Sequence, residues 1–193
     1  TCPTDIYHLF YGLARRTMLT YGLYAVHAAC VGADDNYTLL VGHSGAGKTT
    51  LAQRCIDEHG LKLFSGNKTV VSFADNGEIT AIAGTKTMTA LDAKFNRNAY
   101  TMQPAEYAHA QVVPITSIAI VRINDGVAET QKLTGLAALH TLYPYFMDAV
   151  NADVIVNGQH VFDGTPPLAA KTELTHRLSN ALSRIPVHKH AGN

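Results

Sequence analysis

The stretch that decides the fold is Gly42-His43-Ser44-Gly45-Ala46-Gly47-Lys48-Thr49-Thr50. It fits the P-loop pattern G-x-x-x-x-G-K-[ST], in which glycines let backbone N–H groups turn toward a phosphate. The segment before it, 37–41, is short, apolar and β-prone, and residues 49–59 place apolar side chains at helical spacing. Because the start of a helix adds the positive end of its dipole, this order of strand, glycine loop and helix predicts a nucleotide site made by all nine residues.

Two side chains of the loop have predicted roles in holding the nucleotide. Lys48 is expected to reach the β- and γ-phosphates, and the Thr49 hydroxyl is expected to ligate Mg²⁺. His43 stands at a position that the pattern leaves open, so we expect it on the surface of the loop. The predicted cofactors are ATP or GTP together with Mg²⁺.

The composition indicates a single domain over residues 1–193 with a sizeable core, since 47% of the residues are hydrophobic. Lys plus Arg and Asp plus Glu both number 15 without a basic stripe, which argues against a nucleic-acid partner. No apolar run is long enough to cross a membrane and no secretory signal pattern is present, so we expect a cytoplasmic protein without a membrane partner. The cysteines lack C-x-x-C spacing and are expected to be reduced thiols, with Cys30 and Cys55 buried and Cys2 unassigned. A homo-oligomer is left open.

Hydrophobic spacing predicts an α/β protein with a mixed sheet, β-hairpins and flanking helices. Residues 6–18 have helical spacing, and a strand over 24–31 is joined by a turn at 32–36 to the strand before the P-loop. Strands at 69–74 and 78–83 surround Asp75-Asn76-Gly77, a strong hairpin signal. The later expected elements are a less regular stretch over 85–114, a strand over 115–123, a helix over 133–150 kinked or split at Pro144, a helix from Pro166-Pro167 to about 183 and a strand over 185–190. Strands that come in hairpins argue against the doubly wound parallel sheet of ordinary P-loop enzymes.

This organisation resembles the HPr kinase/phosphorylase family, which shares a P-loop core with the phosphoenolpyruvate carboxykinases. The loop looks like the family's Gly-x-Ser-Gly-x-Gly-Lys-Ser, with Ser44 in third place, and the strand 25–29 is similar to the family strand that carries a histidine, here His27. Residues 58–68 look like the family's Gly-His-x-Leu-x-x-Asp-Asp segment, and 80–88 resemble its glycine-centred strand. The resemblance is specific around 25–68, moderate to about 90 and weak beyond.

The resemblance implies a Mg-dependent kinase that transfers phosphate to a hydroxyl of a protein serine or a small molecule. Its implied catalytic residues are Lys48, His27 and Asn67. In the family, an acidic pair is implied to bind Mg²⁺ and to act as general base, and this pair falls at Gly66-Asn67 here. Gly66 can do neither, while Asn67 can ligate a cation through its carbonyl oxygen but cannot accept a proton.

Other side chains carry weaker expectations. His27 is equally explained as a core histidine, and Lys86 is expected on the surface. Turn sequences explain Asp75 and Asp125 better than a magnesium-binding role does, and no motif supports Glu78 or Asp92. His188 and His190 share one side of a strand but lack a visible third metal ligand. The helical stripe of Leu136, Leu139, Leu142 and Phe146 is expected in the core.

Three functions agree with these observations. The first is an HPr-kinase-like phosphotransferase. The second is a nucleotide-binding module or weak ATPase without kinase activity, as the missing carboxylates suggest. The third is a binding or scaffold protein whose P-loop holds another anion. Acceptor-dependent ADP release distinguishes the first function from the second.

Overall fold

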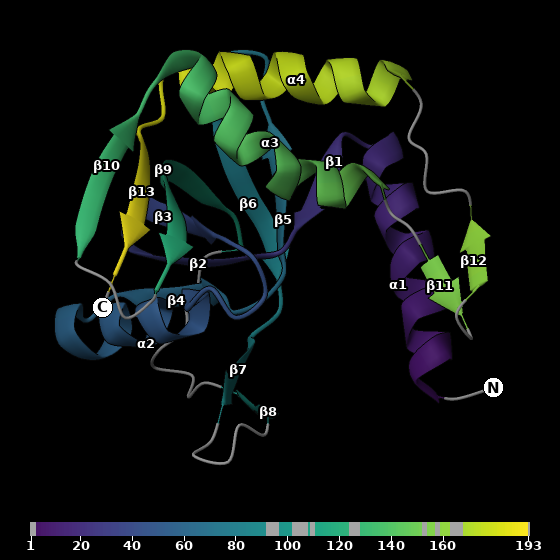
Figure 1. The fold of residues 1–193 in the computed structure, drawn as a ribbon, viewed down its shortest axis with the longest axis horizontal. Helices are drawn as coiled ribbons and strands as arrows, with labels where there is room; N and C mark the ends of the chain where they lie inside the picture. The colour runs from purple at the N-terminus through teal and green to yellow at the C-terminus, as the bar shows by residue number, and fades with distance from the viewer. Residues whose placement is uncertain are drawn as a thin grey trace.

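A mixed β-sheet flanked by helices organises the protein (Figure 1). The computed structural model describes residues 3–91, 97–101, 108, 111–123, 128–151, 154–156, 159–162 and 168–192. Its helices are α1 (Pro3–Thr20), α2 (Lys48–His59), α3 (Gly135–Asn151) and α4 (Leu168–Leu182). Its first strands are β1 (Leu23–Val26), β2 (Ala28–Ala33), β3 (Asn36–Val41), β4 (Lys62–Ser65), β5 (Thr69–Phe73), β6 (Ile79–Gly84), β7 (Thr87–Leu91) and β8 (Arg97–Thr101). The later strands are β9 (Val113–Arg122), β10 (Glu129–Leu133), β11 (Val154–Val156), β12 (Gln159–Phe162) and β13 (Val187–Ala191).

The main sheet has the strand order β1-β5-β6-β9-β3-β2-β4, with β13 beside β9 and β10 beside β13. Strands β3, β9 and β13 are parallel, and the other pairs are antiparallel. The sheet curls and brings β5 back to β2, as shown by the Thr69 hydroxyl at the start of β5, which donates to the carbonyl oxygen of Ala28 in β2 at 3.0 Å. The predicted α/β class with a mixed, hairpin-rich sheet and flanking helices is confirmed at this level.

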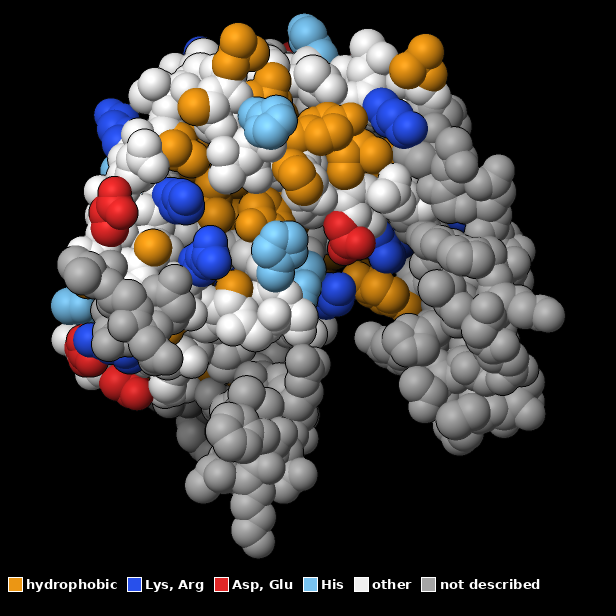
Figure 2. All heavy atoms as spheres, viewed as in Figure 1, with side chains coloured by type: hydrophobic (Ala, Val, Ile, Leu, Met, Phe, Trp, Pro, Cys, Tyr) orange, Lys and Arg blue, Asp and Glu red, His pale blue; other side chains and the backbone are white. Residues whose placement is uncertain are grey.

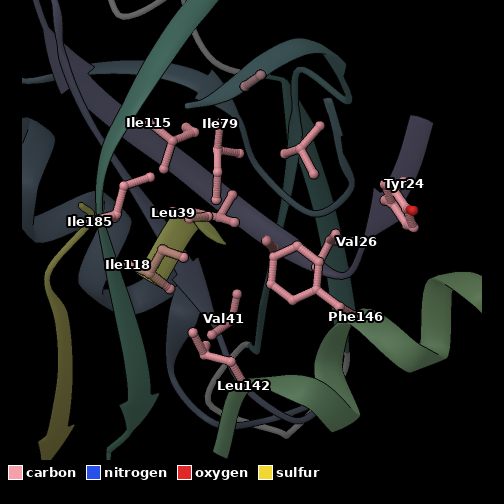
Figure 3. Packing of buried hydrophobic residues seen from close by; sticks show 14 of the residues in the cluster. Tyr24, Val26, Leu39, Val41, Ile79, Ile115, Ile118, Leu142, Phe146 and Ile185 are labelled. Atoms are coloured by element: carbon pink, nitrogen blue, oxygen red, sulfur yellow. The ribbon is translucent and has the colours of Figure 1, made fainter. Parts of the chain in front are cut away.

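Both faces of the sheet are covered, and the alternation of side chains along the strands decides which helix each residue meets. Leu39 and Val41 of β3 pack toward α3 and α4, whereas Leu40 between them packs toward α2. Figure 3 shows Leu142 and Phe146 of α3 pointing into the first of these cores. Both side chains are fully buried, and burial of each contributes about 1.5–3 kcal/mol.

Most local predictions before residue 85 are confirmed. The 6–18 helix lies within α1, the strand before the P-loop is β3, and α2 ends at His59, followed by Gly60, which with a φ of 65° forms the expected cap. The 69–74 and 78–83 strands form the antiparallel hairpin β5–β6 around residues 75–77. Helix α4 holds that turn, since Arg177 Nη1 donates to the Phe73 carbonyl oxygen at 2.8 Å and Asn180 Nδ2 to that of Asp75 at 2.7 Å.

One local prediction is wrong, and others are incomplete. The single strand expected over 24–31 is two strands, β1 and β2, which the bend at His27 sends to distant positions in the sheet. The stretch 85–114, expected to be less regular, contains the antiparallel pair of β7 and β8, and β9 begins at Val113. Of the two outcomes expected at Pro144, a kink or a split, the split is excluded because α3 continues through this residue, and β10 was not expected.

The predictions for the later part of the chain are mostly confirmed. Residues 115–123 fall mainly in β9, α4 is the last helix and β13 is the final strand. The start of the last helix at Pro166-Pro167 lies outside the described residues. None of the described helices is both long and apolar enough to span a membrane.

Three predictions about burial need correction. Leu136 is not in the core, because it lies in the first turn of α3 with 82% of its surface exposed. Lys86 is half-buried rather than a surface lysine, and its Nζ donates to the Phe64 carbonyl oxygen at 2.5 Å while lying 4.7 Å from the centroid of that ring. Cys30 is buried as expected, but Cys55 is only partly covered.

Candidate phosphate-binding site

The glycine loop lies between the end of β3 and the start of α2, as the sequence predicts. Gly47 has a φ of 93°, and a Cβ there would lie 2.6 Å from the side chain of Ile123. Only glycine therefore fits at this position without strain. The backbone N–H of Ile123, just after β9, donates to the carbonyl oxygen of Ala46 at 2.9 Å. The loop is therefore held at the ends of the parallel strands β3 and β9.

Lys48 is the first residue of α2 and is 6% exposed. Its Nζ donates to the carbonyl oxygens of Gly42 and His43, at 2.7 and 2.9 Å. Burial, with a smaller contribution from the nearby charge of Lys68, lowers the pKa of Lys48 to about 8. The side chain is thus folded over the loop that precedes it. At neutral pH Lys48 is protonated in most molecules and carries the positive charge that binds a phosphate.

The other loop side chains differ in exposure. The exposed residues are His43, Ser44, Gly45 and Thr50, while Thr49 is half-buried. The His43 ring lies 5.1 Å from the ring of Tyr145 on α3, centroid to centroid. His43 therefore belongs to the surface of the loop, as expected, and also contacts the helix that passes over it.

His27 lies at the bend between β1 and β2, directly before the residue that pairs with Val41 at the end of β3. Burial together with the charges of Lys48 and Lys68 lowers the pKa of His27 to about 4, opposed by Asp148 and by a hydrogen bond with Asn67. The imidazole is therefore neutral at pH 7. The fold thus brings together Lys48, His27 and Asn67, the three residues for which the resemblance implied catalytic roles.

Two further residues complete what we call the His27 cluster: His27, Asn67, Lys68 and Asp148. Lys68 is half-buried, and burial is the main reason that its pKa is lowered, with Asp148 opposing. Asp148 is exposed on α3. The space-filling view shows histidine, basic and acidic side chains gathered close together below α3 (Figure 2). The electrostatic character of this region, cationic with one carboxylate, suits an anionic ligand.

The sequence analysis did not find Lys68 or Asp148. Lys68 directly follows Asn67 as the last residue of the aligned segment 58–68, and that position was the available signal. Asp148 lies in an apolar helix with no motif around it, and only the packing of α3 brings it to the site.

One of the two positions aligned with the family's acidic pair, Gly66, has no room for a larger side chain. Gly66 is buried, and its N–H donates to the Thr85 carbonyl oxygen at 2.8 Å. A Cβ on Gly66 would lie 2.3 Å from the carbonyl oxygen of Thr87. Asn67 is only half-buried, so it is the one residue of the pair where a carboxylate could be accommodated.

The other acidic candidates lie away from the loop or outside the described residues. Asp75 and Glu78 are in the β5–β6 turn, whereas the opposite end of that hairpin, at Thr69, contacts β2 beside the loop. At about 3.3 Å per residue, the turn lies roughly 20 Å along the hairpin from Thr69. Asp75 therefore has a turn role, and Asp92 and Asp125 are not described.

The structure gives no metal cage to His188 and His190. Their rings stack with centroids 6.1 Å apart, and the Thr130 hydroxyl lies 2.9 Å from Nδ1 of His190. In the described ranges, no group of three or more His, Cys, Asp or Glu side chains could hold a metal ion. The pair is consistent with packing on β13.

Comparison with known proteins adds no assignment: no family model matches the chain, and no curated protein has significant sequence similarity to it. The functional argument therefore rests on the loop, the His27 cluster and their chemistry.

Proposed function

We propose that this protein is a nucleotide-dependent phosphotransferase of the HPr kinase type, which moves the γ-phosphoryl group of ATP or GTP to a hydroxyl group. The observation that carries the proposal is the conformation of Lys48, buried at the start of α2 and bonded to the two loop carbonyls of Gly42 and His43. Its charge, the N–H groups of the loop and the α2 dipole converge where a phosphate chain would bind. The antiparallel β2–β3 pair before the loop agrees with the proposed family and differs from a doubly wound sheet.

The transfer is largely a matter of positioning and charge stabilisation. The acceptor oxygen attacks the γ-phosphorus, a new P–O bond forms, and the bond to the β–γ bridging oxygen breaks, which leaves the nucleoside diphosphate. The hydroxyl proton moves to the ring of His27, whose lowered pKa keeps it neutral and able to accept. Negative phosphate oxygens offset the nearby charges of Lys48 and Lys68, so the bound nucleotide makes His27 a stronger base.

The donor set near the loop fits a Mg²⁺ ion that arrives with the nucleotide. Thr49, the second residue of α2, supplies a half-buried hydroxyl, and Mg²⁺ normally takes its remaining ligands from phosphates and water. When bound, the ion would neutralise part of the phosphate charge.

A nucleotide-binding module or weak ATPase is the second candidate. It is favoured by the buried, sterically closed Gly66 and by the amide at Asn67, because together they place no carboxylate where the family's general base is implied. A protein that holds another anion in the loop is the third candidate.

One set of measurements separates the three candidates. ATP and GTP affinity are measured by calorimetry with Mg²⁺, and ADP or GDP release is followed with and without a panel of hydroxyl compounds and serine-containing proteins. Acceptor-dependent release that is lost in His27→Gln, with unchanged nucleotide affinity, supports the phosphotransferase. Release that no acceptor changes supports the ATPase or module, and phosphate binding without nucleotide binding supports the third candidate.

A further inference from the structure

The guanidinium group of Arg15 is buried, and two of its nitrogen atoms lack hydrogen-bond acceptors among the described residues. Arg15 lies on α1 and is 9% exposed. Within the part of the chain that the structure describes, its Nε and Nη2 atoms have no hydrogen-bond acceptor. Buried polar groups in proteins are normally paired, and an unpaired buried cation is costly. Such a group therefore points to a ligand that supplies the acceptors.

Lys68 brings a second positive charge to the same place. Its Nζ lies 5.3 Å from the centroid of the Tyr11 ring, and Cζ of Arg15 lies 5.5 Å from the same centroid. The charge of Arg15 contributes to the lowered pKa of Lys68. Two cations around one aromatic ring repel each other, and an anion between them would turn this repulsion into two attractions.

The two nitrogen atoms of Arg15 that lack acceptors indicate the chemistry of that anion. Nε and Nη2 lie on one edge of the guanidinium group, where their N–H bonds run side by side. This edge matches two oxygens of one carboxylate or one phosphate group. A single bidentate anion would therefore satisfy both donors.

Lys68 also connects this place to the P-loop. Its charge acts on Lys48 and on His27, and Arg15 acts on Lys68 in turn. A small molecule held at Arg15 and Lys68 would thus extend toward the cluster beside the loop, where the hydroxyl transfer is proposed to occur.

We propose that Arg15 and Lys68 form an anion subsite beside the P-loop, which holds the phosphate or carboxylate group of a small-molecule acceptor whose hydroxyl faces His27. The acceptor role rests on the proposed function, whereas anion binding at Arg15 does not depend on it. Because both Arg15 atoms are buried in this structure, the proposal requires the side chains that cover them to move when the ligand enters. A neutral alcohol would supply no negative charge to either cation, so the subsite selects alcohols that also carry an anionic group.

The test uses the whole chain and two simple anions, inorganic phosphate and acetate. Lys48→Ala serves as the background, since it removes the P-loop lysine and leaves the proposed subsite. Calorimetry then compares this protein with versions that also carry Arg15→Met, Lys68→Met or Arg184→Met. Arg184 is exposed in the turn before β13, so Arg184→Met makes the same chemical change away from the site.

We expect Arg15→Met to weaken the binding of at least one of the two anions about ten- to a hundredfold, as for loss of hydrogen bonds to a charged group. Lys68→Met should weaken the same anion, and Arg184→Met should not. A preference for phosphate identifies a phosphate monoester as the acceptor class, and a preference for acetate identifies a carboxylate. Equal affinity with and without Arg15 for both anions overturns the proposal.

Thermal unfolding without anions keeps the test decisive. Since Nε and Nη2 of Arg15 have no acceptor to lose among the described residues, Arg15→Met should leave the thermal midpoint unchanged or raise it. A lowered thermal midpoint would show that the guanidinium group stabilises the fold, and this result would overturn the subsite. If the parent binds no ATP yet keeps Arg15-dependent anion binding, the nucleotide proposal fails while the subsite stands.

Discussion

The P-loop and the His27 cluster lie side by side, but the chain builds them in opposite ways. The loop is one continuous segment, residues 42–50, whose shape follows from its own glycines and from the start of α2. The cluster takes His27 from a bend between strands, Asn67 and Lys68 from the connection of β4 to β5, and Asp148 from α3. Local backbone chemistry thus defines the first region, and packing between distant segments defines the second.

The two regions also differ in how their charges are compensated. Lys48 has two carbonyl acceptors within the loop itself, so its charge is accommodated before any ligand binds. Among the described residues, the exposed Asp148 favours the charge of Lys68, and Arg15 beside it acts against that charge. We infer that the loop is preorganised for phosphate, whereas the cluster becomes electrostatically complete only with an anion present.

The largest expected effect comes from filling the tightest position of the loop. Gly47→Ala would force a residue with φ of 93° into contact with Ile123, and we expect the free energy of unfolding to fall by about 4 kcal/mol with loss of nucleotide binding. Gly45→Ala is the matched control, because Gly45 has a φ of 80° but no atom within 4 Å of its Cβ position. It should cost about 1 kcal/mol. Equal losses in chemical denaturation would show that crowding at Ile123 does not shape the loop.

The second effect belongs to the cluster and depends on pH. Because the pKa of His27 is about 4 in the folded protein, against 6.5 for the free side chain, the unfolded chain binds a proton in this interval that the folded chain does not. Stability is therefore fully present above pH 6.5 and is lost as the pH falls toward 4, by up to about 3 kcal/mol. Denaturant titrations of the parent and His27→Gln between pH 4 and 7 measure this. Identical slopes in the two proteins would mean that His27 is not held neutral.

A smaller effect is expected when the missing carboxylate is restored. Asn67→Asp should raise ATP turnover about tenfold, at the low end of what a general base supplies, and it should raise the pKa of His27 by placing a negative charge beside the ring. Nucleotide turnover and the imidazole resonances measured by NMR report the two changes, with Asn76→Asp in the β5–β6 turn as the control. Gly66→Asp is not suitable, because its Cβ would collide with Thr87.

The opposite result for Asn67→Asp is also informative. No gain in turnover, combined with its loss in Asp148→Asn, would place the catalytic carboxylate on α3. The assignment of residues 60–68 to the family's acidic segment would then be wrong.

The sequence predicted those parts of the fold and site that nearby residues determine. The P-loop, the α2 cap at Gly60 and the turn at residues 75–77 each depend on a glycine and its neighbours, and all three are present. The bend at His27 was missed because β1 and β2 have the same apolar composition, and only their different partners in the sheet separate them. Composition and spacing contain no record of such long-range pairing.

The same reasoning explains the errors at single residues. Leu136 was assigned to the apolar stripe of α3, but it lies in the first turn, two residues and therefore about 200° around the helix from Ala138, where the buried face begins. Arg15 and Asp148 showed no local signal, since their importance comes from the packing of α1 and α3 around the cluster. His27 and Asn67 were found only through the family resemblance.

The central claim is that Lys48 holds the phosphates of a nucleotide, and calorimetry of Lys48→Ala with ATP and Mg²⁺ tests it most directly. Lys132→Ala, on exposed β10, is the matched control. We predict that Lys48→Ala abolishes measurable ATP affinity while the thermal midpoint stays within about 4 °C of the parent, a change of roughly 1 kcal/mol, and that Lys132→Ala binds like the parent. An ATP affinity of Lys48→Ala equal to that of the parent would contradict the claim.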